Sequence, residues 1–385
     1  MSRFDDLINN IENNRNNPPL WIPLRYPSLS KHMGITKRMY HLIGGDAGTG
    51  KTAFVDQTYL LDAHTYSMKN QDKGVPRIKT TYFSMERSQE YKKAKLLANK
   101  MFLDHNIIVS VPALMNWGMD EPIPDTIIGV AKSYKDFFDT FYEDVEIYDG
   151  IDNPTGVWNR IRRFALANGT LYGKGISGKA VPWKITLNSY LSSHEEDKRK
   201  IIIPESELPR PMRNYEMEFV QDDPHMILQI VLDHMGKPRS ERGFTEKETI
   251  DKMSEYLAIA RDLYGMNVVV INQFNRNIAG IQRRVNTDLS PEQQDFKGSG
   301  NTYEDADVVV GLFNPYKYNL KKYAGYEISK TVNDNGFSRF RAISLLKNSY
   351  GVDNLIAGFK FVGECGYFGQ LPTPNDINYQ ALFNE

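Results

Sequence analysis

The sequence Gly45-Asp46-Ala47-Gly48-Thr49-Gly50-Lys51-Thr52 matches the P-loop pattern G-x-x-x-x-G-K-[ST]. In such a loop the backbone N–H groups form a cradle for phosphates, and the following helix adds its positive end. Residues 38–43 before the loop predict a buried strand, and residues 52–66 predict a helix. This context indicates a nucleoside triphosphatase with ATP and Mg²⁺ as cofactors, in which Lys51 contacts the β- and γ-phosphates and Thr52 binds the metal.

Beyond the P-loop, predicted strands and helices alternate along the chain. The strands are predicted at 78–83, 145–148, 226–232 and 268–271, and the helices at 88–101, 154–167 and 245–264. The last helix begins with a capping box formed by Thr245 and Glu248. This alternation predicts an α/β fold with a mostly parallel central sheet flanked by helices. Segments 340–346, 355–363 and 367–368 alternate at period two and predict antiparallel strands at the C-terminal edge.

The chain divides into an N-terminal arm, residues 1–24, and an ATPase domain, residues 25–385. Apolar side chains at helical spacing in the arm predict a short amphipathic helix, and they are Phe4, Leu7, Ile8 and Ile11. Such a helix is too short to be stable alone in water, so we expect it to dock on its own domain or on a neighbouring subunit. Residues 169–222 predict an insertion, whose charged run 195–200 is either a solvated face or a surface for a partner.

The composition is that of an ordinary globular protein. The 385 residues are 41% hydrophobic and 25% charged, with a formal net charge of −1. Since this charge attracts no nucleic acid as a whole, DNA or RNA binding requires a local basic surface or an assembled channel. No apolar segment is long enough to span a membrane, and the first residues lack the apolar core of a signal peptide. We therefore expect a cytoplasmic location. The single cysteine, Cys365, excludes an internal disulfide and is predicted to be a packed strand residue.

Two acidic residues that follow predicted strands are candidates for the chemistry. Asp233 directly follows the strand 226–232 and is predicted to hold the magnesium through its water shell, although aspartate is also common at strand ends. Glu86 follows the strand 78–83, where a carboxylate is placed to orient and deprotonate the attacking water. The alternative for Glu86 is a favourable interaction of its charge with the start of the next helix.

Gln273 ends the next predicted strand, where its polar side chain is placed to contact the γ-phosphate and to sense its loss. The stretch that follows is basic and contains Arg276, Arg283, Arg284 and Lys297. Loops of this kind are suited to contacts with the backbone of a nucleic-acid strand, and a solvent-exposed loop is the alternative. Arg276 has two further possible partners, the γ-phosphate region and a neighbouring subunit.

Taken together, these segments resemble the C-terminal ATPase domain of DnaB-type replicative helicases, a branch of the RecA-like ATPases. The resemblance covers roughly residues 25–365 and rests on Ala47-Gly48-Thr49-Gly50-Lys51-Thr52-Ala53-Phe54, Phe83-Ser84-Met85-Glu86, Leu232-Asp233-His234, Asn272-Gln273-Phe274-Asn275-Arg276, and Ser299-Gly300 followed by Glu304-Asp305-Ala306-Asp307-Val308-Val309. It implies a RecA-like P-loop fold and a hexameric ring with nucleotide sites between subunits. It also implies that Glu86 is the catalytic base, Asp233 binds magnesium and Gln273 is the sensor.

The same resemblance implies partners and an origin. Single-stranded DNA held by central loops is the implied substrate, other copies of the chain complete the ring, and primase or a helicase loader are further partners. The form Leu232-Asp233-His234 is more similar to the phage primase-helicases than to the bacterial enzymes. A phage or mobile-element origin is therefore expected, with the host cytoplasm as the place of action.

The sequence departs from the family pattern in two ways. Only the arm stands where the family has a separate N-terminal collar domain. Where the family has Lys-x-Arg before a glycine and supplies an arginine finger to the neighbouring subunit, this chain has Lys347-Asn348-Ser349-Tyr350-Gly351. Lys347 lies two residues before Ser349 on the same strand end and is the candidate substitute cation. A surface lysine and a lysine that faces DNA are the alternatives.

The function we expect is that of an ATP-dependent, ring-forming replicative DNA helicase that translocates on single-stranded DNA and unwinds duplex. Two alternatives stay open. One is a recombinase-like ATPase that nucleic acid stimulates, and the other is a non-motor helicase paralogue that acts as a loader or regulator. The near-neutral charge and the absent arginine favour the alternatives, whereas residues 273–307 favour the helicase.

Overall fold

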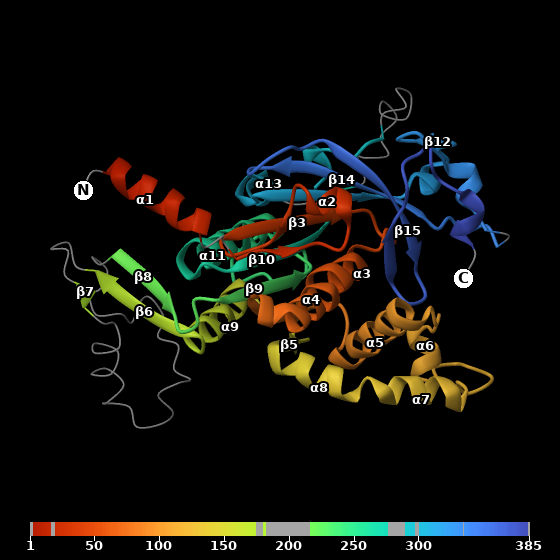
Figure 1. Cartoon of the computed structure of the whole chain (residues 1–385), viewed down its shortest axis with the longest axis horizontal. Coiled ribbons are helices and arrows are strands. Elements are labelled where there is room, and N and C mark those ends of the chain that lie inside the picture. The colour runs from red at the N-terminus through yellow and green to blue at the C-terminus, as the bar shows by residue number, and fades with distance from the viewer. Residues whose placement is uncertain are drawn as a thin grey trace.

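The computed structural model of the protein describes residues 3–16, 20–174, 180–181, 216–275, 289–296, 300–333 and 335–383. Its centre is a nine-stranded sheet in the order β16-β15-β14-β11-β3-β10-β9-β4-β5, flanked by helices (Figure 1). The strands from β11 to β5 in this order run parallel, whereas β14, β15 and β16 are antiparallel to their neighbours. The predicted α/β fold and its antiparallel C-terminal edge are confirmed.

The strands of this sheet lie close to their predicted positions, except β11, which the sequence-based expectations did not include. In chain order they are β3 Met39–Gly45, β4 Arg77–Ser84, β5 Val145–Tyr148, β9 Met226–Asp233, β10 Asn267–Gln273, β11 Val308–Phe313, β14 Phe340–Asn348, β15 Leu355–Val362 and β16 Tyr367–Gln370. The helices around it are α3 Lys51–Val55, η1 Asp56–Asp62, α4 Ala63–Asn70, α5 Gln89–His105, α6 Val111–Leu114, α7 Asp125–Ser133, α8 Lys135–Asp144, α9 Pro154–Leu166, α11 Glu246–Tyr264 and α13 Gly300–Asp305.

Shorter elements lie outside the main sheet. They are α1 Arg3–Asn16, β1 Ile22–Pro23, α2 Pro27–Ser30, β2 Gly34–Ile35, β6 Gly169–Lys174, β7 Ala180–Val181, β8 Glu216–Gln221, β12 Lys322–Tyr323, β13 Tyr326–Glu327, and the 3₁₀ turns Gln71–Lys73, Gln293–Asp295, Pro315–Tyr318, Ile328–Thr331 and Tyr379–Leu382. Strands β6 and β8 are the described ends of the predicted insertion, and with β7 they form a separate antiparallel sheet. The charged run 195–200 lies outside the described residues.

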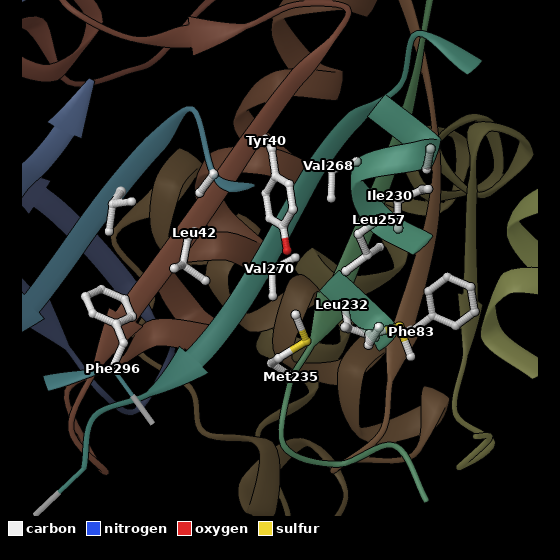
Figure 2. Close-up of a cluster of buried hydrophobic side chains, with 14 of the residues drawn as sticks. Tyr40, Leu42, Phe83, Ile230, Leu232, Met235, Leu257, Val268, Val270 and Phe296 are labelled. Carbon is white, nitrogen blue, oxygen red and sulfur yellow. The ribbon is translucent and has the colours of Figure 1, made fainter. Parts of the chain in front are cut away.

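The central sheet has a hydrophobic core on each face because its strands are buried on both sides. On β10, Val268 and Val270 belong to one cluster, whereas Val269 and Ile271 belong to the other, as the two-residue period of a strand requires. Figure 2 shows the first cluster, where Val270 and side chains from neighbouring strands face Leu257 of α11. The continuous helix 51–70 covers the opposite face. Each fully buried aliphatic side chain contributes about 1.5–3 kcal/mol, so these clusters hold the strand ends in register.

Three details differ from the sequence-based expectations. The helix after the P-loop extends to Asn70, and its middle, Asp56–Asp62, is a π-helix. Helices α6, α7 and α8 form a helical segment between α5 and β5 that the sequence analysis did not assign. Cys365 is buried as expected, but it lies in the turn between β15 and β16, so its prediction as a strand residue is wrong. The turn buries this thiol because Cys365 packs in one cluster with Ala98 and Met101 of α5.

Helix α1 confirms the predicted helical arm. It extends outward from the body of the molecule (Figure 1), and three apolar side chains of its predicted stripe are exposed: Phe4 by 66%, Ile8 by 38% and Ile11 by 55%. These side chains are therefore not covered by the described part of the same chain. Among the described helices, none combines the length and the apolar character needed to cross a membrane.

Candidate functional site

The P-loop connects the end of β3 with the start of the helix at Lys51. Gly48 and Gly50 have φ angles of 78° and 94°, in the left-handed region that favours glycine. At Gly50 a side chain is excluded in a second way, because a Cβ would lie 2.8 Å from the ring of Phe368 and 2.9 Å from that of Phe361. The loop therefore has the backbone conformation in which successive N–H groups can point toward a bound anion.

Asp46 organises the P-loop from within. Its Oδ1 accepts a hydrogen bond from the N–H of Ala47 at 2.9 Å, and its Oδ2 accepts from Lys317 Nζ and from Tyr318 Oη, both at 2.6 Å. Burial alone raises the pKa of Asp46, but the bonds from Lys317 and Tyr318 hold it below its ordinary value. Asp46 is therefore ionised at neutral pH, and Lys317 balances its negative charge next to the P-loop.

Lys51 is the cation of the P-loop pattern, and its ammonium group lies inside the same site. Its Nζ donates to the backbone oxygen of Asp46 at 2.9 Å. Burial lowers the pKa of Lys51 to about 8, although the carboxylates of Asp233, Asp46 and Glu86 oppose this shift. A phosphate anion in the cradle would favour the charged form further, since an opposite charge nearby stabilises the protonated amine.

Thr52 and Asp233 meet across two elements, as the sequence analysis expected for a magnesium site. Thr52 Oγ1 donates to Asp233 Oδ1 at 3.2 Å, and the carboxylate is almost fully buried. The pairing of β4 with β9 places Ser84 beside Asp233, so Asp233 ends its strand at the same edge as the P-loop. A hydroxyl and a carboxylate oxygen are ligands suited to hydrated Mg²⁺, so the residues present fit this metal.

Glu86 lies just before α5, whose N-cap is Ser88. Its Oε1 is 3.1 Å from His234 Nε2 and 3.0 Å from Lys237 Nζ. Burial raises the pKa of Glu86, but Lys237 and His234 outweigh that effect and hold it below its ordinary value. Burial in turn lowers the pKa of His234, and the carboxylates of Glu86 and Asp233 oppose this shift. An ionised carboxylate held by two partners is positioned to accept a proton from water.

A cavity of about 430 Å³ brings these groups together. Its lining includes Lys51, Thr52, Glu86, Asp233 and Gln273. Gln273 is the last residue of β10 and pairs with Gly45 at the start of the P-loop. The cavity therefore lies at the carboxyl ends of parallel strands, where ligands of open α/β sheets bind.

Several residues of the site were not identified from the sequence. Arg341 is buried beneath the loop, and its Nε donates to the backbone oxygen of Thr49 at 3.3 Å. Burial lowers the pKa of Arg341 to about 10, so it stays charged at neutral pH. Lys317 and Tyr318 reach the loop from the turn after β11, and no local pattern marks them. Lys92 was detectable, because helical spacing places this cation on the same buried face as Leu96 and Asn99 of α5.

Other predicted residues lie elsewhere or beyond the described chain. Lys347 is at the opposite end of the sheet from the P-loop, where its Nζ donates to the backbone oxygens of Tyr303 at 3.2 Å and Glu304 at 2.9 Å. It thus interacts with the C-terminal turn of α13, a favourable place for a cation. Ser349 is exposed in the turn that follows. Arg276, Arg283, Arg284 and Lys297 lie outside the described residues.

Comparisons with known proteins agree with this architecture. No protein-family model and no curated protein matches the sequence. A solved structure of a DnaB-like replicative helicase, determined with its interactions with primase, is similar with a TM-score of 0.58 and 14% identity, over 95% of this chain and 67% of that one. A second solved structure, of an ATPase domain, is similar with a TM-score of 0.57 and 14% identity, over 96% of this chain and 99% of the other. The chain therefore has the RecA-like fold of the ATPase domain of DnaB-type replicative helicases.

Proposed function

We propose that this protein binds ATP with Mg²⁺ in the 430 Å³ cavity and hydrolyses it. The observation that carries the proposal is the meeting of a P-loop, a Thr52–Asp233 pair and a held Glu86 carboxylate at one edge of a parallel sheet. Positioning and electrostatic stabilisation provide nearly all of the catalysis in phosphoryl transfer. A site that holds its cation, metal ligands and base in fixed places meets that requirement.

In this proposal each side chain has a separate task. Lys51 exchanges the backbone oxygen of Asp46 for the β- and γ-phosphates, and the P-loop N–H groups hold the phosphate oxygens. Thr52 and Asp233 hold the hydrated Mg²⁺, which neutralises charge on the phosphates. Glu86 orients the attacking water and accepts its proton, while Gln273 responds to the γ-phosphate.

A second cavity of about 460 Å³ adjoins the first and shares Phe361 and Gly363 with it. Its lining contains the aromatic side chains of Tyr316 and Phe337 together with the amide of Asn314. Aromatic rings and amide groups suit a planar base with hydrogen-bonding edges. We assign the nucleoside part of ATP to this second cavity.

The work that we propose for the hydrolysis is translocation of a hexameric ring along single-stranded DNA, with unwinding of duplex and with primase or a loader as a partner. The likeness to helicase ATPase domains supports this proposal. Arg276, Arg283, Arg284 and Lys297 are the proposed contacts to the DNA backbone, and Lys347 is the proposed cation supplied to the neighbouring site. The place of action in this proposal is the cytoplasm, that of the host if a phage encodes the protein.

The contacts between subunits have a proposed location in this structure. A groove of about 770 Å³ runs between α5, α6, α7 and α8 and is lined by apolar side chains that include Leu97, Met115 and Ile128. The exposed stripe of α1, with Phe4 and Ile11, is the complementary surface that we propose for it. Deleting residues 3–16 and replacing Ile128→Arg should then shift sedimentation toward the monomer. An unchanged oligomer in both variants would reject this docking.

A second function has one specific observation in its favour. The turn at Ser349 carries no arginine, and Lys347 already binds the end of α13. A non-motor paralogue that binds nucleotide and loads or regulates a partner needs no cation across the interface. A slow ATPase without strand displacement is what this alternative predicts.

One experiment separates these functions. ATP turnover is measured with and without single-stranded DNA, beside strand displacement on a forked duplex, and Lys51→Ala serves as the inactive control. A helicase shows both stimulated turnover and displacement, and a recombinase-like ATPase shows only stimulated turnover. A non-motor paralogue binds nucleotide without either response. Absence of nucleotide binding in the unmodified protein would overturn the proposal as a whole.

A further inference from the structure

A buried polar cluster lies beside Asp233 and contacts its Oδ2, whereas the hydroxyl of Thr52 contacts its Oδ1. It consists of Tyr82 on β4, Lys92 on α5 and Asp56 on the helix after the P-loop. These side chains are almost completely buried, with exposed fractions of 0%, 1% and 4%. One carboxylate, one ammonium group and one phenol hydroxyl are therefore largely shielded from water, next to the residue that we assign to the metal, and Asp56 and Lys92 also line the edge of the 430 Å³ cavity.

The ammonium group of Lys92 fixes one direction in the hydrogen bonds of this cluster, and the Tyr82 hydroxyl then has the carboxylates of Asp233 and Asp56 as acceptors. Lys92 Nζ donates to Tyr82 Oη at 2.8 Å and to both carboxylate oxygens of Asp56, at 3.2 and 3.1 Å. An ammonium group has no acceptor, so the Tyr82 oxygen must accept from Lys92 and turn its own O–H elsewhere. That O–H donates to Asp233 Oδ2 at 3.1 Å.

This direction decides which oxygen of Asp233 remains for the metal. Oδ2 is engaged by Tyr82, and Lys92 Nζ lies 3.5 Å from the same atom. Oδ1 is left facing Thr52 Oγ1 at 3.2 Å. Stability alone gives little reason for such a cluster, because desolvation of a buried ion pair offsets much of its Coulomb energy. Orientation of a carboxylate ligand gives a stronger reason, since partners behind the ligands tune metal affinity.

We propose that Tyr82, supported by Lys92 and Asp56, is a positioning residue that orients Asp233 toward Thr52 for the hydrated Mg²⁺. The inference rests on the proposed nucleotide site and names the groups that prepare its metal ligand. Tyr82 does not touch nucleotide or metal in this scheme. Its hydroxyl acts only through the carboxylate of Asp233.

The test uses Tyr82→Phe, which removes one hydroxyl and changes neither charge nor ring. Binding of mant-ATP, a fluorescent ATP analogue, is titrated at increasing Mg²⁺ and again in EDTA. We expect Tyr82→Phe to require about 10-fold more Mg²⁺ for half-maximal binding, as partners behind metal ligands typically contribute 10–100-fold. Its affinity for mant-ATP in EDTA should equal that of the unmodified protein, which a merely structural defect would not preserve.

Tyr59→Phe is the matched control. Tyr59 is also fully buried, but its hydroxyl is bonded to His41 Nδ1 at 3.2 Å, outside the site. This control should keep the Mg²⁺ requirement of the unmodified protein while losing a comparable buried hydrogen bond. Equal Mg²⁺ midpoints for Tyr82→Phe, Tyr59→Phe and the unmodified protein would overturn the inference.

A second variant tests the support behind Tyr82. The double replacement Asp56→Asn with Lys92→Gln removes one negative and one positive charge together, so the net charge of the site is unchanged, although Asp233 loses its contact with Lys92 at 3.5 Å. Because Tyr82 can then turn its O–H toward the new amide oxygens, we expect the Mg²⁺ midpoint to rise a few-fold, and adding Tyr82→Phe should raise it less than additively. A midpoint equal to that of the unmodified protein would overturn the role of Lys92 and Asp56. If the unmodified protein binds no mant-ATP at any Mg²⁺ concentration, the proposed function itself fails.

Discussion

The two ends of the central sheet differ in what their charged groups contact. At the carboxyl ends of β3, β4, β9 and β10, side chains from separate strands meet in one cavity around Lys51 and Asp233. At the other end, the turn between β14 and β15 exposes Tyr350 by 64% and Val352 by 62%. The ammonium group of the nearby Lys347 donates hydrogen bonds to carbonyl oxygens of its own chain.

This difference separates a complete site from an incomplete one. The P-loop end contains, within one chain, every group that we propose for binding nucleotide and activating water. The turn end offers the exposed side chains of Tyr350 and Val352 and a cation, Lys347, that must first leave α13 to act elsewhere. We therefore expect substitutions at the P-loop end to have larger effects on turnover than substitutions at the turn end.

Lys51→Ala should have the largest effect. Loss of the cation that we assign to the β- and γ-phosphates should lower ATP turnover by about 1,000-fold, while the fold is retained. Lys317→Ala, at the same loop, should lower turnover less, because Lys317 acts on the loop through Asp46 and not on the proposed phosphates directly. The rate of ATP turnover measures the loss of activity, and circular dichroism measures whether the fold is retained. Hydrolysis at the unmodified rate in Lys51→Ala would remove the P-loop end from the chemistry.

Glu86→Gln should have the next largest effect. A glutamine keeps the shape of the side chain but accepts no proton, so turnover should fall by about 100-fold while ATP stays bound. Glu241→Gln is a matched control, since Glu241 is also held by a lysine, Lys252 at 2.6 Å, outside the cavity. Single-turnover hydrolysis and mant-ATP binding are the measurements. Equal turnover in both variants would leave Glu86 without a role as base.

Lys347→Ala tests the turn end and should have a smaller effect. If Lys347 serves the neighbouring site, turnover should fall by about 10-fold with little loss of ATP affinity, less than for an arginine with its bidentate fork. Mixing Lys347→Ala subunits with Lys51→Ala subunits should then restore part of the activity. Lys322→Ala, which removes an exposed pair with Glu327, is the surface control.

The complementation in this mixture decides between the two ends. Mixed rings contain some interfaces with an intact P-loop on one side and an intact Lys347 on the other. Co-assembly without any recovery of turnover would show that Lys347 serves only the end of α13. In that case the groups that act in hydrolysis would lie at the P-loop end, and Lys347 at the other end would have no part in it.

Between the two ends lie two buried histidines, and they should make the free energy of unfolding depend on pH. His41 and His64 are buried, and burial lowers the pKa of each to about 3. The unfolded chain binds their protons below pH ~6.5 but the folded chain does not, so the free energy of unfolding falls as the pH falls. The loss is about 1.4 kcal/mol per pH unit for each histidine between pH ~6.5 and ~3.

His64→Gln should remove one of these two contributions. The amide can keep the contact with Thr80 Oγ1, which the imidazole makes at 3.0 Å. Urea unfolding at pH 6, 5 and 4 should therefore show a pH slope that is smaller by about 1.2 kcal/mol per unit than in the unmodified protein. An identical slope in the two proteins would mean that His64 is protonated in the folded state.

Much of the fold was predictable because it depends on short-range patterns. The strand 145–148 and the helix 245–264 with its capping box were predicted within a residue of β5 and α11. The helices from α6 to α8 were missed, since they interrupt the simple alternation on which the prediction rested. The positions of Asp233 and Gln273 at one sheet edge were also predictable, because each ends a strand, and the position of Thr52 followed from the P-loop pattern.

The partners of those candidates were not predictable in the same way. Tyr318 reaches Asp46 from 272 positions further along the chain, and Tyr82 lies 151 positions from Asp233. Such contacts depend on the order of strands in the sheet and on the packing of α5 against the helix after the P-loop. Neither is encoded in the spacing of nearby residues.

The local sequence is thus sufficient for the conformation of the P-loop and for the parallel character of the sheet. Glycine alone relieves the strain at φ angles such as those of Gly48 and Gly50, and strand periodicity is a property of neighbouring residues. The orientation of Asp233 required the folded chain, because its two oxygens are assigned by Tyr82 on β4 and Thr52 after β3. Only when packing removes water from between these elements does each carboxylate oxygen keep its own protein partner.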